Sequence, residues 1–210
     1  MKQIQNERGN AALYLIWLLG VIFLIFIIVI NIVKVYVVKE QANTAVEQAA
    51  FAGTSVLIEK TKASIRTFDQ SGSEESILQR EIDGMSIESL LNETITQYSN
   101  LDSLDAFVKA ANEILPSRIS SYSGLKREFL SSFSDISHTV SPTVYTIIQE
   151  NESNTEDVEI YFSREYWRLE IQSTVTFETI SDRKWMPAFQ EDILQKGYGP
   201  SLHYIESVFN

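Results

Sequence analysis

The sequence contains no cysteine and only two histidines, His138 and His203, among its 210 residues. Without cysteine the chain has neither disulfide bonds nor thiolate ligands for a metal ion. The two histidines stand in no HExxH motif or other metal-ligand spacing, so we expect no metal site at either of them. An extracellular domain of this chain would therefore have to rely on its packed core for stability.

Basic residues are also scarce. The chain has 17 Lys and Arg against 28 Asp and Glu, a formal net charge of −11. Residues 1–39 carry four basic residues and one acidic residue, or +3, which leaves −14 for the remainder. So acidic a segment would repel the phosphates of nucleic acid and the headgroups of anionic lipids. We therefore expect no nucleic-acid partner.

Motifs for catalysis and for cofactor binding are missing. There is no GxSxG elbow and no SxxK–KTG set, and Gly197-Tyr198-Gly199 lacks the third glycine, the preceding strand and the long following helix of a phosphate loop. The acidic cluster Glu156-Asp157-Glu159 lacks the ligand pattern of an EF-hand. We expect no enzyme and no cofactor. A hydrolase whose Ser, Lys or His side chains meet only in space stays open as an alternative.

One long apolar run is present. Residues 11–33 (AALYLIWLLGVIFLIFIIVINIV) contain no charged residue, and as a helix they would span about 34 Å, against about 30 Å for the hydrocarbon core of a bilayer. The run is longer than the apolar region of a cleaved signal peptide. We predict a single membrane-spanning helix here, preceded by a tail at residues 1–10. Because basic residues flank both ends of the run, the charges alone do not fix its orientation.

Beyond the membrane the helical pattern continues through residues 34–60 and carries many alanines. Gly and Pro are absent between Lys34 and Ala52. Small and apolar residues recur at spacings of three and four, which is typical of helix packing. We call them the helix-packing stripe: Asn31, Val35, Val38, Ala42, Ala45, Ala49, Ala52 and Val56. Alanine side chains let two helix backbones approach closely, so we predict contact with a partner helix. A merely solvated stalk is the alternative, since alanine also has the highest helix propensity.

Residues 64–210 are expected to form an α+β outer domain after a loose polar connection at 61–73. Three helical patterns come first, over 87–98, over 104–114 with an end at Pro116, and over 119–136 with Gly124 as a weak point. Alternating apolar residues then predict strands over 144–148, 158–162 and 167–177. The last segment, 187–210, is expected to hold a short helix that stops at Gly197, and a second through Leu202, Ile205 and Val208. The predicted fold class is thus α+β.

The N-terminal residues resemble a known family. ERGNAALYLIWLLGVIFLI, followed by VYVVKEQANTAVEQAAFAG, is similar to the TadE/TadG-like components of Tad (Flp-type) pilus assembly, over about residues 7–55. The resemblance implies a pseudopilin-like or minor-pilin-like membrane protein with its N-terminus in the cytoplasm and its large domain outside. Members cut by a prepilin peptidase carry Glu at the fifth position after the cleavage glycine. Counted from Gly9, that position is Tyr14, so we expect the chain to stay uncut.

The resemblance also implies the partners. These are other pilus-assembly or pseudopilin membrane proteins and the lipid bilayer, with a homo-oligomer as a further possibility. The predicted function is assembly of a surface pilus or a related secretion apparatus through helix packing. A membrane-anchored ligand-binding or adhesion module is the second hypothesis, supported by the acidic, strand-containing half and by the aromatic residues Trp185 and Tyr198.

Overall fold

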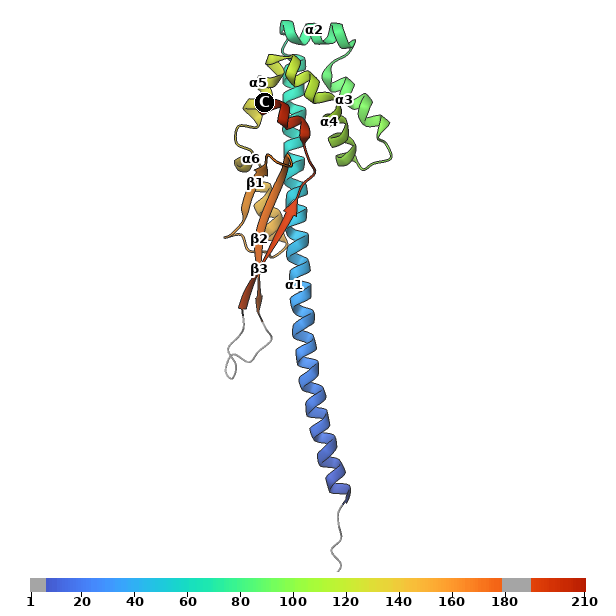
Figure 1. Cartoon of the computed structure of the whole chain (residues 1–210), viewed down its shortest axis with the longest axis vertical. Coiled ribbons are helices and arrows are strands. Elements are labelled where there is room, and N and C mark those ends of the chain that lie inside the picture. The colour runs from blue at the N-terminus through green and yellow to red at the C-terminus, as the bar shows by residue number, and fades with distance from the viewer. Residues whose placement is uncertain (1–6, 179–189) are drawn as a thin grey trace, which may run out of the picture.

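The computed structural model describes residues 7–178 and 190–210, and their arrangement confirms the α+β class (Figure 1). One long helix, α1 (Glu7–Gln70), runs the length of the molecule, and every other element lies beside or above its second half. Five shorter helices follow in the chain: α2 (Glu74–Asp83), α3 (Ile87–Gln97), α4 (Ser103–Ser121), α5 (Ser123–Ser132) and α6 (Ile136–Glu150). Three strands and a C-terminal turn of helix complete the described fold: β1 (Glu159–Ser163), β2 (Arg168–Glu178), β3 (Gln190–Tyr198), η1 (His203–Ile205) and α7 (Glu206–Phe209).

The helix α1 is unbroken from the membrane span into the outer domain. The loose connection predicted at 61–73 is therefore wrong for residues 61–70, which belong to α1. The helix also continues through Gly53. The reason is packing, because Leu57, Ile65 and Phe68 are buried and make this stretch part of the core. The segments 34–60 and 64–210 share one hydrophobic core, although their boundaries stay predictions.

The strands form an antiparallel sheet in the order β1-β2-β3. Ile160 pairs with Ile171 across the first two strands, and Val175 pairs with Ile193 across the last two. Leu169, Ile171 and Val175 on the central strand are buried, as expected for one face of a strand that packs on a core. The sheet lies against α1 (Figure 1). The strands predicted at 158–162 and 167–177 are thus confirmed.

The strand predicted at 144–148 is wrong, because these residues lie in α6. Val144 and Ile148 are four residues apart, and a spacing of four fits both a strand and a helix. The buried residues Ile136, Val140, Val144 and Ile148 show that the period of four continues through the whole element. Pro142 lies inside this helix and did not break it, and Pro116 likewise lies inside α4 rather than at its end.

The predicted helix before Gly197 is also wrong, since this segment forms β3. The alternation of inward and outward residues in β3 is not visible in the sequence. The inward residue closest to α1 is Gly197, which has no apolar side chain to contribute to a hydrophobic pattern. The helix predicted at 87–98 is confirmed as α3, and that through Leu202, Ile205 and Val208 as η1 and α7. The helix predicted over 119–136 is instead divided among the end of α4, α5 and the start of α6.

Candidate interaction surface on the long helix

The lower half of α1 has the surface of a membrane-spanning helix. It contains the one candidate span among the described residues, and none of its most apolar stretch is buried by the rest of the chain. Trp17, Phe23 and Tyr36 are all more than 60% exposed. Side chains this apolar are unfavourable in water, and a bilayer would cover them. By length, composition and exposure, this helix has the properties of a membrane span, and it is the one such helix among the described residues.

Asn31 is the polar member of the helix-packing stripe within the apolar run. Its side-chain amide donates a hydrogen bond to the carbonyl oxygen of Ile27, one turn earlier, at 3.0 Å. A polar group in a bilayer has to be satisfied by the protein itself. This bond satisfies one of the two N–H donors of the Asn31 amide within its own helix.

The alanines at the centre of the stripe are covered by this chain itself. Ala42, Ala45 and Ala49 are each no more than 1% exposed, and the strands β2 and β3 together with α6 lie along this part of α1. The small side chains permit close approach of the protein's own sheet and helix, and the predicted contact with a partner helix stays a prediction. A partner could reach these three alanines only if the sheet moved away.

Two glycines, Gly197 in β3 and Gly199 just after it, lie against the backbone and side chains of α1. A β-carbon at Gly197 would lie 2.0 Å from the carbonyl oxygen of Val46, and one at Gly199 would lie 2.2 Å from the hydroxyl oxygen of Thr54. Both distances are below any real contact of a β-carbon. Neither glycine is among the packing residues predicted from the sequence. The available signal was their spacing of two, which places both on one face of an extended chain and is typical of close backbone approach.

The outer members of the stripe are not fully covered. Ala52 and Val56 are half-buried and lie at the edge of a shallow groove of about 670 Å³. We call it the outer groove, and it is lined by Ala52, Ser55, Val56, Glu59, Lys60, Ala63 and Thr143. Nearer the membrane, Val35 and Val38 are half-buried as well. Of the predicted stripe, the structure therefore leaves the two ends accessible and closes the middle.

Two ion pairs lie beside the outer groove, one within α1 and one between α1 and α3. Lys62 donates to the carboxylate of Glu59 at 2.8 Å, and Arg66 donates to that of Glu88 at 2.8 Å. Both pairs are largely exposed, and pairs of this kind contribute little to stability. In the part of the chain that the structure describes, no three His, Cys, Asp or Glu side chains gather as metal ligands. What the arrangement offers is a surface for packing.

Residues 9–56 match the family model described as "Putative Flp pilus-assembly TadE/G-like". This segment is TadE/G-like. The match begins in the first turns of α1, spans the apolar run and ends within the outer part of the same helix. The TadE/G-like segment therefore covers the whole predicted helix-packing stripe, whereas the sheet and the other helices lie outside it. No curated protein and no solved structure matches the chain at a significant level.

Proposed function

We propose that this protein is a pseudopilin-like or minor-pilin-like membrane component that helps to assemble a Tad/Flp-type surface pilus or a related secretion apparatus. In this proposal it acts by helix–helix packing along α1, with the N-terminus in the cytoplasm and the outer domain outside. The observation that carries the proposal is the TadE/G-like helix itself, which is bare through the membrane span and continues without a break into the core of the outer domain.

Packing within the membrane is supported by the chemistry of the span. Hydrocarbon provides no hydrophobic driving force between two apolar helices, so they associate through close contact of their side chains and backbones. Gly20 has no atom within 4 Å of the position that a β-carbon would take, so its side of the helix is open. Isoleucine, leucine and phenylalanine side chains surround this glycine, and a neighbouring helix could pack among them.

Outside the membrane, the outer groove offers a second accessible stretch of α1 for packing. It has two half-buried members of the predicted stripe, Ala52 and Val56, and the exposed small residues Ser55 and Ala63. A partner would reach this groove as a contact separate from the one in the bilayer, since Ala42, Ala45 and Ala49, which lie between the two, are covered by the chain itself. The covered alanines then serve a different purpose, because they fix the outer domain to α1 and so fix the direction in which the groove faces.

The proposal can be tested with Ser55→Arg and Ala63→Arg combined in one chain. Both side chains point to solvent, so the outer domain is expected to keep its fold, which circular dichroism and the melting temperature check. The bulky charges would block a helix from entering the outer groove. We expect surface filaments, counted by electron microscopy in cells that lack the native gene, to fall at least tenfold after complementation with this variant.

Thr67→Arg provides the matched control, since Thr67 is an exposed residue of α1 that does not line the outer groove. It should complement as well as the native protein. Normal filament numbers with the folded double variant would refute packing through the outer groove. Normal filaments in cells without the gene would refute the role in pilus assembly altogether.

The second candidate is a membrane-anchored ligand-binding or adhesion module, and a polar cleft supports it. This cleft has a volume of about 440 Å³ and is lined by Ser153, Asn154, Thr155, Glu156, Asp157, Thr174, Thr176 and Asp192. The amide of Asn154 donates to the hydroxyls of Thr174 and Thr176, so part of its polar lining is already satisfied. Trp185 lies outside the described residues, and Tyr198 is exposed with the guanidinium of Arg168 4.2 Å from its ring centre.

Soluble ligands can be screened against the full chain in detergent by the shift of its melting temperature. A fragment starting at residue 64 is unsuitable, because Ala45, Ala49 and Leu57 of α1 belong to the core and would be missing. A shift that Asp157→Asn with Asp192→Asn removes would favour the binding module. No shift with any ligand of the screen would count against it.

A further inference from the structure

The helix α2 (Glu74–Asp83) buries polar side chains and exposes apolar ones. Its inward residues are polar, with Ser76 2% and Gln79 0% exposed. Its outward residues are apolar, and the exposed fractions of Ile77, Leu78 and Ile82 are 51%, 50% and 66%. A surface helix normally shows the opposite pattern, with an apolar stripe facing the core. The exposed side chains of α2 are therefore not explained by the fold of this chain.

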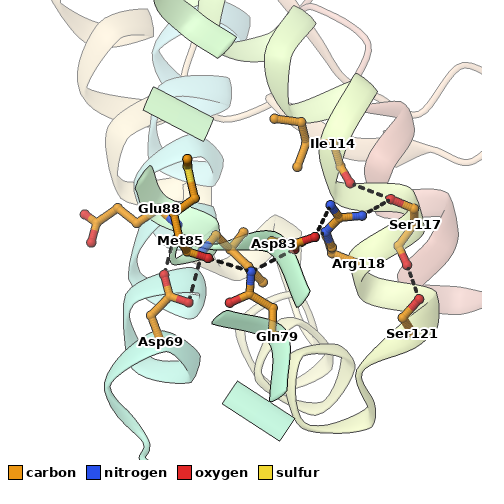
Figure 2. Close-up of polar contacts among 10 residues, drawn as sticks. Asp69, Gln79, Asp83, Met85, Glu88, Ile114, Ser117, Arg118 and Ser121 are labelled. Atoms are coloured by element: carbon orange, nitrogen blue, oxygen red, sulfur yellow. Dashed lines mark hydrogen bonds and ion pairs between the residues drawn. The ribbon is translucent and has the colours of Figure 1, made fainter. Parts of the chain in front are cut away.

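Polar contacts hold α2 in place (Figure 2). The guanidinium of Arg118 donates two hydrogen bonds to the carboxylate of Asp83, at 2.8 and 2.9 Å. The amide of Gln79 donates to the same carboxylate at 2.9 Å and to the carbonyl oxygen of Met85 at 3.0 Å. Paired, bidentate contacts of this kind specify geometry as well as adding energy. The apolar residues are thus not needed to attach the helix.

The first turn of α2 is attached in the same way. The carboxylate of Glu75 accepts hydrogen bonds from the hydroxyl of Ser123 and from the backbone amide of Gly124, each at 2.6 Å. With both ends clamped to α4 and α5, the outward side of α2 is held in a fixed orientation. A surface that is apolar, oriented and unused by its own domain has the properties of a docking site.

The outward residues follow the spacing of one helix face. Glu74, Ile77, Leu78, Glu81 and Ile82 recur at intervals of three, four, seven and eight, and all are exposed; we call them the distal face. Two carboxylates therefore border three apolar side chains. A complementary surface would present apolar side chains bordered by Lys or Arg. A second copy of the distal face would bring four carboxylates together, so like-charge repulsion opposes self-association here.

The position of the distal face also excludes the protein's own membrane as its natural partner. Figure 1 shows α2 at the end of the molecule opposite to the membrane helix. Between Lys34 and Gln70, α1 rises by about 1.5 Å per residue, or roughly 55 Å in all. At that height the carboxylates lie far from the bilayer, and they would in any case be repelled by anionic headgroups.

We propose that the distal face is a docking site for another protein, whose contacting segment offers apolar side chains flanked by basic residues. This goes beyond packing along α1, since it concerns the opposite end of the molecule and a different chemistry. The contact uses Ile77, Leu78 and Ile82 for burial and Glu74 and Glu81 for charge pairing. Most of its specificity comes from the charges, which reject acidic surfaces, including a second copy of this domain.

The test is a photo-crosslinking amino acid placed at position 78 of the full chain in its native cell, with the adduct identified by mass spectrometry. We expect one adduct with a different protein, at a peptide containing Lys or Arg next to apolar residues. Glu74→Lys with Glu81→Lys should reduce its yield at least tenfold, and so should Ile77→Ser with Ile82→Ser. Leu130→Ser on α5, where Leu130 is 41% exposed, is the matched control and should leave the yield unchanged.

Four results would overturn the proposal: no adduct at all, an adduct with lipid only, an adduct between two differently tagged copies of this chain, or a contacting peptide without basic residues. Retention of the native melting temperature by each variant shows that a lost adduct is not due to unfolding. Ser55→Arg with Ala63→Arg should leave the adduct intact. The proposals for the outer groove and for the distal face can therefore fail separately.

Discussion

A β-carbon at position 197 would lie 2.0 Å from the carbonyl oxygen and 2.2 Å from the carbonyl carbon of Val46. Both atoms belong to the backbone of α1, which cannot move aside as the end of a flexible side chain can. At the scale of single residues, the attachment of the sheet to α1 thus depends on the absence of a side chain at Gly197, as it does at Gly199 beside Thr54.

We predict that Gly197→Ala lowers the free energy of unfolding by about 3 kcal/mol, at the upper end of what overpacking costs in a well-packed interior. The reason is that β3 must shift away from α1 to make room. Lys196→Ala, at the exposed neighbouring position of the same strand, should change stability by less than about 0.5 kcal/mol. Denaturant unfolding of both variants checks this; equal stability would contradict the close approach.

A buried hydroxyl pair joins α1 to the C-terminal helical turn. Tyr204 is fully buried and its hydroxyl lies 2.6 Å from that of Thr61, while Thr61 donates its own proton to the carbonyl oxygen of Leu57. Tyr204 is therefore the donor in the pair. Burial in this apolar region raises the pKa of the Tyr204 phenol above its usual value, which keeps it protonated.

Removing the Thr61 hydroxyl and removing the Tyr204 hydroxyl should lower stability by different amounts. Thr61→Val leaves the buried Tyr204 hydroxyl without an acceptor and should cost about 2 kcal/mol, whereas Tyr204→Phe leaves Thr61 satisfied and should cost about 1 kcal/mol. Unfolding free energies of the two variants, measured by denaturant titration, test the order. If Tyr204→Phe proved the more harmful change, the assignment of donor and acceptor would be wrong.

At the scale of elements, α2 is held by polar contacts where most helices use apolar ones. The hydrogen bond from Ser123, and then that from the amide of Gly124, lower the pKa of the Glu75 carboxyl. A carboxyl with a lowered pKa stabilises the folded state above its ordinary pKa of about 4.3, and this contribution is lost as the pH falls through the folded value. Acid should therefore loosen the contact between α2 and α5.

This predicts that the amide resonance of Gly124 shifts with a midpoint below about pH 4.3 as Glu75 becomes protonated. Glu75→Gln should abolish the shift, because the side chain then has no titrating proton. Glu74→Gln, one residue earlier on the exposed side of α2, should leave the shift in place. Nuclear magnetic resonance of the full chain in detergent provides the measurement, and a midpoint above the ordinary glutamate value would contradict the inferred contact.

A second carboxyl nearby behaves in the opposite sense. Burial raises the pKa of Asp69, and the backbone amides of Glu88 and Ile87, which donate to it at 2.9 and 3.3 Å, oppose that rise. A raised carboxyl pKa means that the folded state binds the proton more readily than the unfolded state does. The contribution of Asp69 to the stability of the folded state therefore decreases as the pH rises through its titration. Asp69 joins the end of α1 to the first turn of α3.

At the scale of the whole molecule, α1 makes the membrane segment and the outer domain continuous. This single helix is packed in the hydrophobic core at one end and exposed at the other. Its direction in the bilayer therefore determines how the rest of the fold, including the distal face, is oriented (Figure 1). The absence of cysteine makes the orientation easy to test, because a single introduced cysteine is the only thiol in the chain.

We predict that a membrane-impermeant maleimide labels Glu74→Cys on intact right-side-out vesicles, since Glu74 is exposed at the outer end. Gln3→Cys should be labelled only after the membrane is opened with detergent. The amount of labelled protein on a gel gives the result. Labelling in the reverse order would place the outer domain in the cytoplasm and end the proposed role outside the cell.

The sequence alone determined the membrane span and the two strands β1 and β2. A run of 23 uncharged, largely apolar residues from 11 to 33 is long enough to cross a bilayer as a helix, and the alternation over 167–177 indicates a strand. It also determined that α1 has a face of small residues, because that is a matter of spacing along one helix.

Only the tertiary structure decided what that face touches. The small side chains of Ala42, Ala45 and Ala49 allow another element to pack closely on α1. That element could equally be a helix of a neighbouring protein or the chain's own sheet. The approaching strand β3 was hidden because its contact residue, Gly197, has no side chain to add to a hydrophobic pattern. The inverted helix α2 was hidden for a related reason: its polar residues face inward because Arg118, Ser123 and Gly124, distant in sequence, bind them there.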